Sequence, residues 1–204
     1  MRICVFGATG GVGGHIVRQA LDRGDTVTAV VRDPARLRMR HPALTVTVDE
    51  AGVMRGSDVV LSAVGARGRH DGPVASTVTR AILGAMKAEG VRRIVVVSAG
   101  PVGPPAGGDG FLDRRILRPI VSAVFKDVYA DLRAMERVLA ESPADWTVVR
   151  PPKLVDKPLT GRYRTAVGGN LPRGRSIARA DVAHAMLAAA GDPATIGRAV
   201  GVAY

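Results

Sequence analysis

The chain has 204 residues, a length at which a single domain can bury one substantial hydrophobic core. Its one cysteine, Cys4, excludes a disulfide framework within the chain and a zinc site built from several cysteines. The glycine-rich segment that begins at Gly7 leaves no room for a signal peptide, and no apolar run reaches the roughly 18 residues of a membrane span. We therefore expect a soluble, cytoplasmic protein with no membrane partner.

The formal net charge of +11 comes mainly from arginine, since only four of the 29 basic residues are lysine. Such a charge can indicate nucleic-acid binding. Aromatic residues make up only 3% of the chain, however, the arginines are spread along it, and no nucleic-acid recognition motif is present. We therefore expect mostly solvated arginines, no nucleic-acid partner, and attraction of small molecules that carry phosphate or carboxylate groups.

Short segments rich in β-branched residues alternate along the chain with segments of helical periodicity. Helices with one apolar face are predicted up to Gly24, up to about Gly90, and over residues 128–139. This alternation is typical of a parallel sheet covered by helices on both faces. The predicted strands lie at residues 2–6, 26–31, 44–48, 58–64, 93–98 and 146–150.

The predicted fold is therefore a single α/β domain over residues 1–204, doubly wound and Rossmann-like, with a small C-terminal region that forms a substrate pocket. Its expected strand order is 3-2-1-4-5-6, and ligands of such sheets bind outside the carboxyl ends of the strands. Because the predicted helices leave no apolar stripe large enough for an obligate interface, we expect a monomer.

The turn after the first predicted strand is rich in glycine, with the sequence VFGATGGVGG at residues 5–14. Gly7, Gly10 and Gly13 have the spacing that permits a tight turn, a close backbone approach to a pyrophosphate, and close packing of helix against strand. The start of the following helix, which includes Gly11 and Val12, would present free N–H groups and a partial positive charge to the phosphates. The segment predicts a dinucleotide-binding turn.

The second predicted strand ends in Arg32, where NAD-binding proteins carry an acid for the adenosine ribose. Asp33 precedes Pro34 and a helical segment, so its carboxylate is expected to act as an N-cap. Arg32, together with Arg36, is then free to bind the 2′-phosphate of NADP(H), which we predict as the cofactor. A solvated arginine at a strand end is the alternative.

Two further strands end at the same sheet edge. Ala63 and Val64 end the fourth predicted strand, Gly65 follows it, and all three are counted as cofactor-binding residues. Ser98 ends the fifth strand, beside the expected nicotinamide and within reach of a polar atom of the substrate, and is the candidate catalytic residue; its alternative role is to cap the following loop. Residues 99–110, mostly glycine, proline and alanine, are either a lid or a surface connection.

Classical short-chain dehydrogenases use a tyrosine and a lysine four residues later for proton transfer. Here Tyr129, a candidate substrate-binding residue, is followed at that spacing by Arg133, which holds its proton and cannot share a relay easily. A standard alcohol dehydrogenase mechanism is therefore not expected. The four histidines have no spacing that suggests a metal site, and His184 is predicted to lie on a helix without a chemical role.

Several segments together resemble the atypical short-chain dehydrogenases with an NAD(P)H-binding, NmrA-like domain, and within them the biliverdin-IXβ reductase/flavin reductase group. The stretch from Pro151 to Tyr163 is the most specific part of this resemblance. The segments that carry it are VFGATGGVG, TVTAVVRDPARL, VVLSAVG, AILGAMKAEGVRRIVVVSAG, WTVVRPPKLVDKPLTGRY and SIARADVAHAML.

The resemblance implies an NADPH-dependent reductase that passes a hydride to a flavin or an open tetrapyrrole. It implies that Thr9 joins the three glycines at the pyrophosphate and that Pro151 and Pro152 shape the pocket wall. Two residues depart from the reductase pattern, since Lys153 and Glu136 each stand in place of a histidine. Lys153 would bind a small substrate that is anionic and aromatic. An NADP-binding NmrA-like sensor without turnover is the alternative function, and an isomerase or dehydratase is a third.

Overall fold

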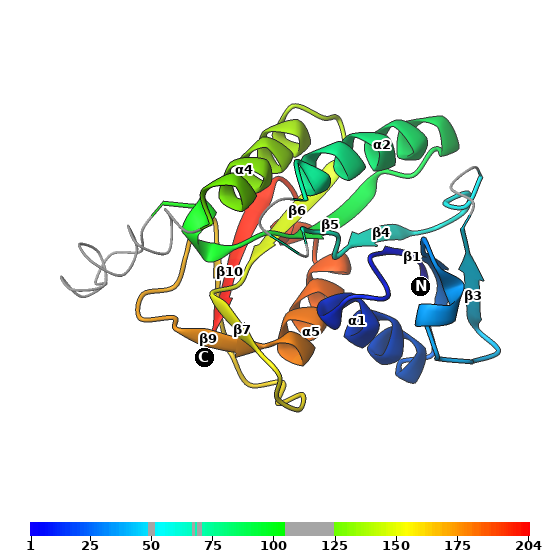
Figure 1. Ribbon diagram of the computed structural model, residues 1–204, viewed down its shortest axis with the longest axis horizontal. Coiled ribbons are helices and arrows are strands. Elements are labelled where there is room, and N and C mark those ends of the chain that lie inside the picture. Colours follow the sequence, from blue (N-terminus) through cyan, green and yellow to red (C-terminus); the bar gives the residue numbers. More distant parts are fainter. Residues whose placement is uncertain (49–51, 67, 69–70, 105–124) are drawn as a thin grey trace.

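The computed structural model describes residues 1–48, 52–66, 68, 71–104 and 125–204 (Figure 1). An eight-stranded sheet with the order β3-β2-β1-β4-β5-β6-β10-β8 forms its centre. All neighbouring strands are parallel except β8, which runs antiparallel to β10. The strands are β1 (Arg2–Phe6), β2 (Thr26–Val30), β3 (Leu44–Thr47), β4 (Val59–Ser62), β5 (Arg93–Val97), β6 (Asp145–Arg150), β8 (Arg164–Val167) and β10 (Arg198–Ala203).

The first six strands have the predicted order, and the predicted doubly wound α/β class is confirmed. The expectation that the sheet ends at its sixth strand is wrong, because β10 and β8 extend it beyond β6. These two strands gave weak sequence signals: β8 is an edge strand with mostly exposed residues, and Gly201 interrupts the β-branched pattern of β10. Several predicted strands also end one or two residues earlier than expected, so that Ala63 and Val64 follow β4 rather than belong to it.

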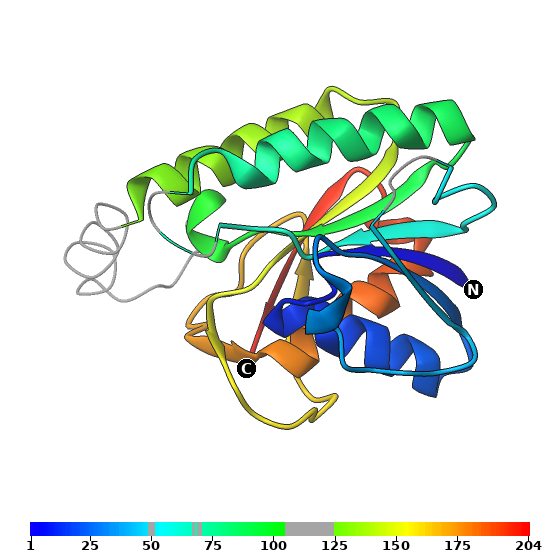
Figure 2. The same ribbon diagram turned by 45° about the vertical axis from the view of Figure 1, so that its right-hand side comes forward.

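Two pairs of helices cover the two faces of the sheet (Figures 1 and 2). The helices α1 (Gly11–Asp22) and α5 (Arg179–Ala190) pack together on one face, and α2 (Val74–Glu89) and α4 (Lys126–Ala140) pack together on the other. Successive residues of β1 serve the two layers in turn, since Ile3 and Val5 belong to the core beneath α1 and α5, whereas Cys4 and Phe6 belong to the core beneath α2 and α4.

The helix pair α2 and α4 is also joined by a buried polar contact. The carboxylate of Asp131 in α4 accepts hydrogen bonds from the backbone N–H groups of Ala75 (2.7 Å) and Ser76 (3.0 Å), in the first turn of α2. Pro73, the residue before α2, provides no side-chain cap. A side chain from a distant helix therefore satisfies the free N–H groups that every helix start leaves open.

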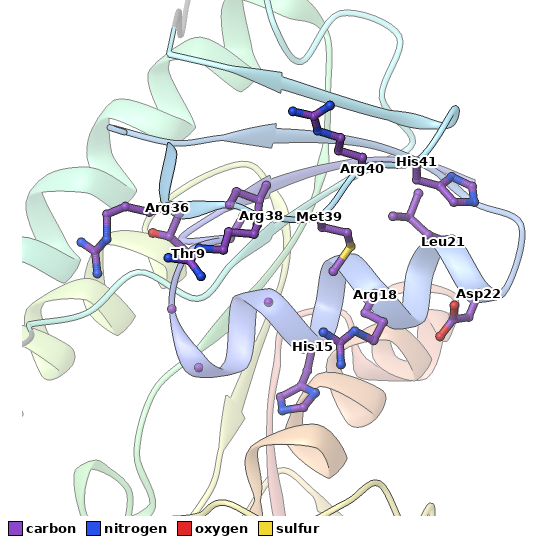
Figure 3. Close-up of a pocket in the computed structure, with 15 residues that line it drawn as sticks. Thr9, His15, Arg18, Leu21, Asp22, Arg36, Arg38, Met39, Arg40 and His41 are labelled. Atoms are coloured by element: carbon purple, nitrogen blue, oxygen red, sulfur yellow. The ribbon is translucent and has the colours of Figure 1, made fainter. Parts of the chain in front are cut away.

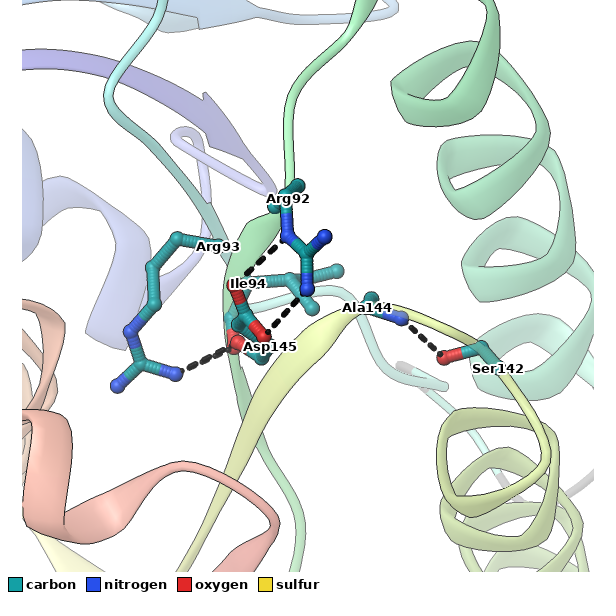
Figure 4. A network of polar contacts seen from close by, with 6 residues as sticks. All are labelled: Arg92, Arg93, Ile94, Ser142, Ala144 and Asp145. Atoms are coloured by element: carbon teal, nitrogen blue, oxygen red, sulfur yellow. Dashed lines mark hydrogen bonds and ion pairs between the residues drawn. The ribbon is translucent and has the colours of Figure 1, made fainter.

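Arg92 and Arg93 connect the start of β5 to β6 and to α5 (Figure 4). These contacts lie at the amino ends of the strands, opposite the edge where a ligand would bind. Arg92 makes two hydrogen bonds to the carboxylate of Asp145, and Arg93 donates to the carbonyl of Asp145 at 2.7 Å. Arg93 also donates to Ala189 and Ala190 at the carboxyl end of α5, where a cation suits the helix dipole. Burial lowers the pKa of Arg93.

Short elements complete the described chain. They are β7 (Lys153–Val155) and β9 (Ser176–Ala178), which pair in parallel as a second sheet, and the 3-10 turns η1 (Pro34–Arg36), η2 (Gly100–Val102) and η4 (Pro193–Thr195). Within the residues that the structure describes, no helix is long and apolar enough to cross a membrane.

Candidate functional site

The glycine-rich turn joins β1 to α1 as the sequence predicted. Gly7 has a φ of +79°, a conformation that favours glycine, and its carbonyl accepts a hydrogen bond from the N–H of Gly10 at 2.9 Å. A Cβ atom on Gly13 would lie 2.1 Å from the carbonyl oxygen of Gly7, so helix and turn can approach only without a side chain there. Gly10 precedes α1 and provides no side-chain cap, which leaves the first N–H groups of the helix open to an anion.

Arg179, which the sequence analysis missed, covers the start of α1. A Cβ atom on Gly11 would lie 2.6 Å from the Cδ of Arg179, so the arginine side chain runs directly over this residue. Arg179 is the first residue of α5 and forms an ion pair of 2.6 Å with Asp156, in the stretch that carries the most specific resemblance. No local sequence pattern links Arg179 to Gly11, because the two are brought together only by the packing of α5 against α1.

The end of β2 has the arrangement that the sequence predicted for Asp33. Its Oδ1 atom accepts a hydrogen bond from the N–H of Ala35 at 3.1 Å, and Pro34 follows as the first residue of η1, which is a short 3-10 turn rather than an α-helix. Arg32 and Arg36 are exposed, and neither guanidinium has an ion-pair partner among the described residues. Arg32 and Arg36 therefore stand on either side of Asp33, whose carboxylate already caps η1.

A groove of about 610 Å³ runs along α1 between the helix and residues 36–41 (Figure 3). Among the predicted cofactor residues, Thr9, Gly10, Gly11 and Arg36 line it, whereas Arg32 does not. Arg18, Arg38 and Arg40, which the sequence analysis did not single out, add further positive charge, and Asp22 is the one carboxylate among the lining residues that the structure describes. The alternating arginines of RLRMR at residues 36–40 are a sequence signal from which the positive charge on this side of the groove could have been predicted.

His15 also lines the groove, close to the cations. Burial lowers the pKa of His15, and the neighbouring positive charges of Arg18 and Arg179 lower it further, against the opposing effect of Asp156. The imidazole therefore favours its neutral form at pH 7, and the positive charge of the groove comes from arginine.

Ser98 directly follows β5 and is held in a polar network with two side chains from other elements. Its hydroxyl donates a hydrogen bond of 2.6 Å to Oε1 of Glu136 in α4, and the guanidinium of Arg150, at the end of β6, donates to both oxygens of the same carboxylate. The side chains of Glu136 and Arg150 are only 14% and 13% exposed. A carboxylate can only accept, so the hydroxyl proton of Ser98 points to Glu136 and the Oγ lone pairs remain available.

Residues 98–104 are tied to the end of β6 and to a distant loop. The N–H of Ser98 donates to the carbonyl of Val149 (2.8 Å), and the N–H of Gly100 donates to the carbonyl of Pro151 (2.7 Å). Asn170 donates to the carbonyls of Gly100 and Pro104. The first half of the segment proposed as a lid is therefore anchored through η2, and its second half, residues 105–110, lies outside the described residues.

The remaining predicted residues lie after β4, around the start of β7, and in α4. Ala63, Val64 and Gly65 follow β4, and the carbonyl of Ala63 approaches Gly7 closely, so they lie beside the glycine turn. Pro151 and Pro152 lie between β6 and β7, against η2. Lys153 is exposed at the start of β7, and no contact between it and Tyr129, the other substrate candidate, is observed in the described part of the chain.

Tyr129 lies half-buried near the start of α4, with its ring centroid 6.0 Å from that of Phe125. Burial raises the pKa of its hydroxyl, the opposite of the shift that a proton relay at neutral pH needs. Arg133, one turn further on, is exposed and lines a different cavity. The tyrosine-lysine relay of classical short-chain dehydrogenases is not formed by these two residues.

The segment around Thr160 is fixed by the buried carboxylate of Asp181 in α5. Asp181 accepts hydrogen bonds from the N–H groups of Thr160 and Gly161, from the Thr160 hydroxyl and from the Tyr204 hydroxyl. Burial opposes its ionisation, but these bonds outweigh that effect and lower its pKa. His184, predicted to be a helix residue without a role, lies in α5 and its Nδ1 is 2.7 Å from the hydroxyl of Tyr163.

Comparison with known proteins relates this arrangement to nicotinamide-nucleotide binding. A protein-family model described as NAD(P)H-binding matches residues 7–193. This range includes the glycine turn, the end of β2, Ser98 and the segment up to η4.

Solved structures from several bacteria are similar over the whole chain. One, a provisionally assigned exported protein from Burkholderia pseudomallei, is 27% identical with a TM-score of 0.81, and the match covers 100% of both chains. A provisionally assigned epimerase from Bacteroides thetaiotaomicron is 26% identical with a TM-score of 0.81, covering 100% of this chain and 96% of the other. A provisionally assigned NADH-flavin reductase from Streptococcus pneumoniae, 22% identical, has the same fold with a TM-score of 0.81, covering 100% and 99%.

Proposed function

The chain belongs to the NAD(P)H-binding family, and from this premise we propose that it is an NADPH-dependent reductase that transfers a hydride to a flat conjugated acceptor, a flavin or a biliverdin-like tetrapyrrole. The observation that carries the proposal is the end of β2, where Arg32 stands in place of the ribose-binding acid while Asp33 is engaged as the cap of η1. The 22% identical protein named as an NADH-flavin reductase is consistent with such an acceptor.

The residues of the glycine turn fit a dinucleotide. The pyrophosphate would meet the open N–H groups at the start of α1, in a cradle that a Cβ on Gly13 would fill. Arg179 supplies a cation beside the same helix start, and Arg32 and Arg36 would hold the 2′-phosphate. When bound, the cofactor would supply the hydride.

The chain's own residues would orient the acceptor and exclude water from it. Ser98, fixed by Glu136, offers acceptor lone pairs at the carboxyl edge of the sheet, and η2 together with Pro151 and Pro152 forms the adjoining wall. Because the hydroxyl proton of Ser98 is committed to a carboxylate, Ser98 acts here as a hydrogen-bond acceptor rather than as a proton donor. Lys153, exposed at β7, and Tyr129 are proposed to bind the anionic acceptor.

A nucleotide sensor without turnover is the second candidate. It is favoured by the missing tyrosine-lysine relay and by the raised pKa of Tyr129, since a sensor needs the cofactor site alone. The reductase comes first because Ser98, Glu136 and Arg150 form a polar network at the edge where the nicotinamide would lie. A protein that only binds the nucleotide through its adenosine half does not need such a network.

One experiment separates the two candidates. The purified chain is mixed with NADPH and, in turn, with FMN, riboflavin and a biliverdin, and NADPH oxidation is followed by absorbance; NADP with simple secondary alcohols is the control reaction. A reductase oxidises NADPH with at least one of the acceptors and leaves the alcohols unchanged. Tight NADPH binding without oxidation by any acceptor indicates the sensor, and rapid alcohol oxidation overturns the proposed mechanism.

A further inference from the structure

A second cavity, of about 400 Å³, lies between α4 and the sheet at β6 and β10. None of its described lining residues also lines the arginine-rich groove beside the glycine turn. Its size is within the range of about 300–1,000 Å³ that small-molecule sites usually have. The cavity is therefore large enough for a compact organic ligand and is separate from the place where the pyrophosphate would bind.

The charged groups around this cavity are mostly positive. Arg133 and Arg137 stand one turn apart on α4 and face the same space, and Arg150 reaches it from the end of β6. Among the described lining residues Glu136 is the one carboxylate, and its two oxygens already accept hydrogen bonds from Arg150. The guanidinium groups of Arg133 and Arg137 have no ion-pair partner among the described residues, so two positive charges remain unbalanced at the cavity.

The floor of the cavity is apolar. It consists of the half-buried ring of Trp146 and the buried side chain of Val148 on β6, with Val102 and Ala199 beside them. Val148 belongs to the core that lies beneath α2 and α4, and the other three residues pack against that core. An apolar floor bordered by a few charged groups is the usual make-up of a site for a small organic molecule.

We propose that this cavity binds a small organic anion that has one carboxylate and an apolar body. The carboxylate is recognised by the free guanidinium groups of Arg133 and Arg137, which bind carboxylates with good geometry, and the body covers Trp146 and Val148. A multiply charged phosphate compound fits less well, because it would place charge on the apolar floor. The site goes beyond the proposed reductase activity and does not depend on it.

The site is also connected to the cofactor edge. Glu136 lines the cavity, and its carboxylate accepts the hydrogen bond of Ser98. A ligand beside Arg150 and Glu136 is therefore one side chain away from the hydroxyl that follows β5.

The chain itself provides the probe for a test, because Trp146 is its only tryptophan. Octanoate is titrated against the unmodified protein while tryptophan fluorescence is recorded, and octanamide, which has the same shape without the charge, is titrated in parallel. We expect a saturable change with octanoate, with a dissociation constant on the order of 1 mM, and binding at least tenfold weaker with octanamide.

The variant Arg133→Gln/Arg137→Gln removes both free charges and keeps polar side chains that are shorter than arginine. It should bind octanoate at least tenfold more weakly and octanamide as before. The matched control is Arg55→Gln/Arg80→Gln, which removes two exposed arginines outside the cavity and should leave octanoate binding unchanged. Circular dichroism confirms that each variant is folded.

Three results overturn the proposal. They are the absence of a saturable fluorescence change with octanoate, equal binding of octanoate and octanamide, and an equal loss of octanoate affinity in the cavity variant and the control variant. The last would mean that octanoate responds only to the net charge of the protein.

Discussion

The hydroxyl of Ser98 donates a hydrogen bond of 2.6 Å to Oε1 of Glu136, a residue 38 positions further along the chain. The bond joins the end of β5 to the middle of α4, and Arg150 closes the network from β6. The hydrogen bond to Glu136 fixes the direction of the Ser98 hydroxyl proton, because a serine hydroxyl without such a partner is free to rotate.

Ser98→Ala tests the role of this hydroxyl. We expect kcat/KM for the flavin acceptor to fall about ten- to hundredfold, the loss of one hydrogen bond to a charged or polar partner, while the midpoint of unfolding in urea changes little. Steady-state kinetics and urea unfolding measure the two effects. An unchanged kcat/KM would mean that Ser98 only helps to hold the carboxylate of Glu136 in place.

Glu136→Gln tests the partner. Because the change leaves the guanidinium of Arg150 nearly buried without its carboxylate, the free energy of unfolding should fall by about 2–3 kcal/mol. Glu141→Gln, an exposed residue at the end of α4, is the control and should change it by less than about 0.5 kcal/mol. Equal stability of the two variants would contradict a structural contribution from the ion pair.

Arg32→Ala tests the cofactor preference. NADPH should bind more tightly than NADH to the unmodified protein, and the variant should lose most of the difference, about ten- to hundredfold in affinity, because one charge-assisted contact to the 2′-phosphate is removed. Titration calorimetry with both nucleotides measures the difference. Equal affinity of the unmodified protein for the two nucleotides would refute the assignment of Arg32.

Gly13→Ala tests the close approach of α1 to the glycine turn. A methyl group 2.1 Å from the carbonyl oxygen of Gly7 must displace backbone, so we expect the free energy of unfolding to fall by about 2–3 kcal/mol and nucleotide binding to be lost. Gly84→Ala is the control, because Gly84 lies in the interior of α2 with open space around it. There alanine should stabilise the helix by up to about 1 kcal/mol, and thermal unfolding should give opposite signs for the two variants.

Asp131→Asn tests the contact that joins α4 to the start of α2. The amide offers one acceptor oxygen in place of two, so one of the N–H groups of Ala75 and Ser76 loses its partner and the free energy of unfolding should fall by about 1–3 kcal/mol. Asp127→Asn, an exposed position on the same helix, is the control. Urea unfolding that shows the same small change in both variants would contradict the prediction.

Asp181 predicts how stability depends on pH. Its pKa in the folded chain is lowered, so its ionised form stabilises the fold fully above the unfolded pKa of about 3.9, and this contribution is lost as the pH falls through the folded value. Asp181→Asn should therefore unfold more easily than the unmodified chain at pH 7, and the difference should shrink below about pH 4. Urea unfolding from pH 7 to pH 3 measures it, and a difference that stays constant would refute this linkage.

From the sequence alone it was possible to predict the first six parallel strands, their order, and the glycine turn before α1. These features depend on local signals: β-branched runs specify buried parallel strands, and Gly7, Gly10 and Gly13 are read from their spacing alone. The cap formed by Asp33 was predictable for the same reason, because its hydrogen bond reaches only two residues along the chain.

Which side chains meet across the sheet edge depends on the packing of the whole fold. Glu136 and Arg150 reach Ser98 from two other elements, and Arg179 covers Gly11 from a helix 168 residues later in the chain. Contacts at such separations depend on how helices pack against the sheet, and no periodicity or spacing in the sequence encodes them. The sequence did not predict β8 because it lies at the sheet edge, where one side of the strand faces solvent and an apolar run is not required. It did not predict β10 because Gly201 interrupts the β-branched pattern of that strand.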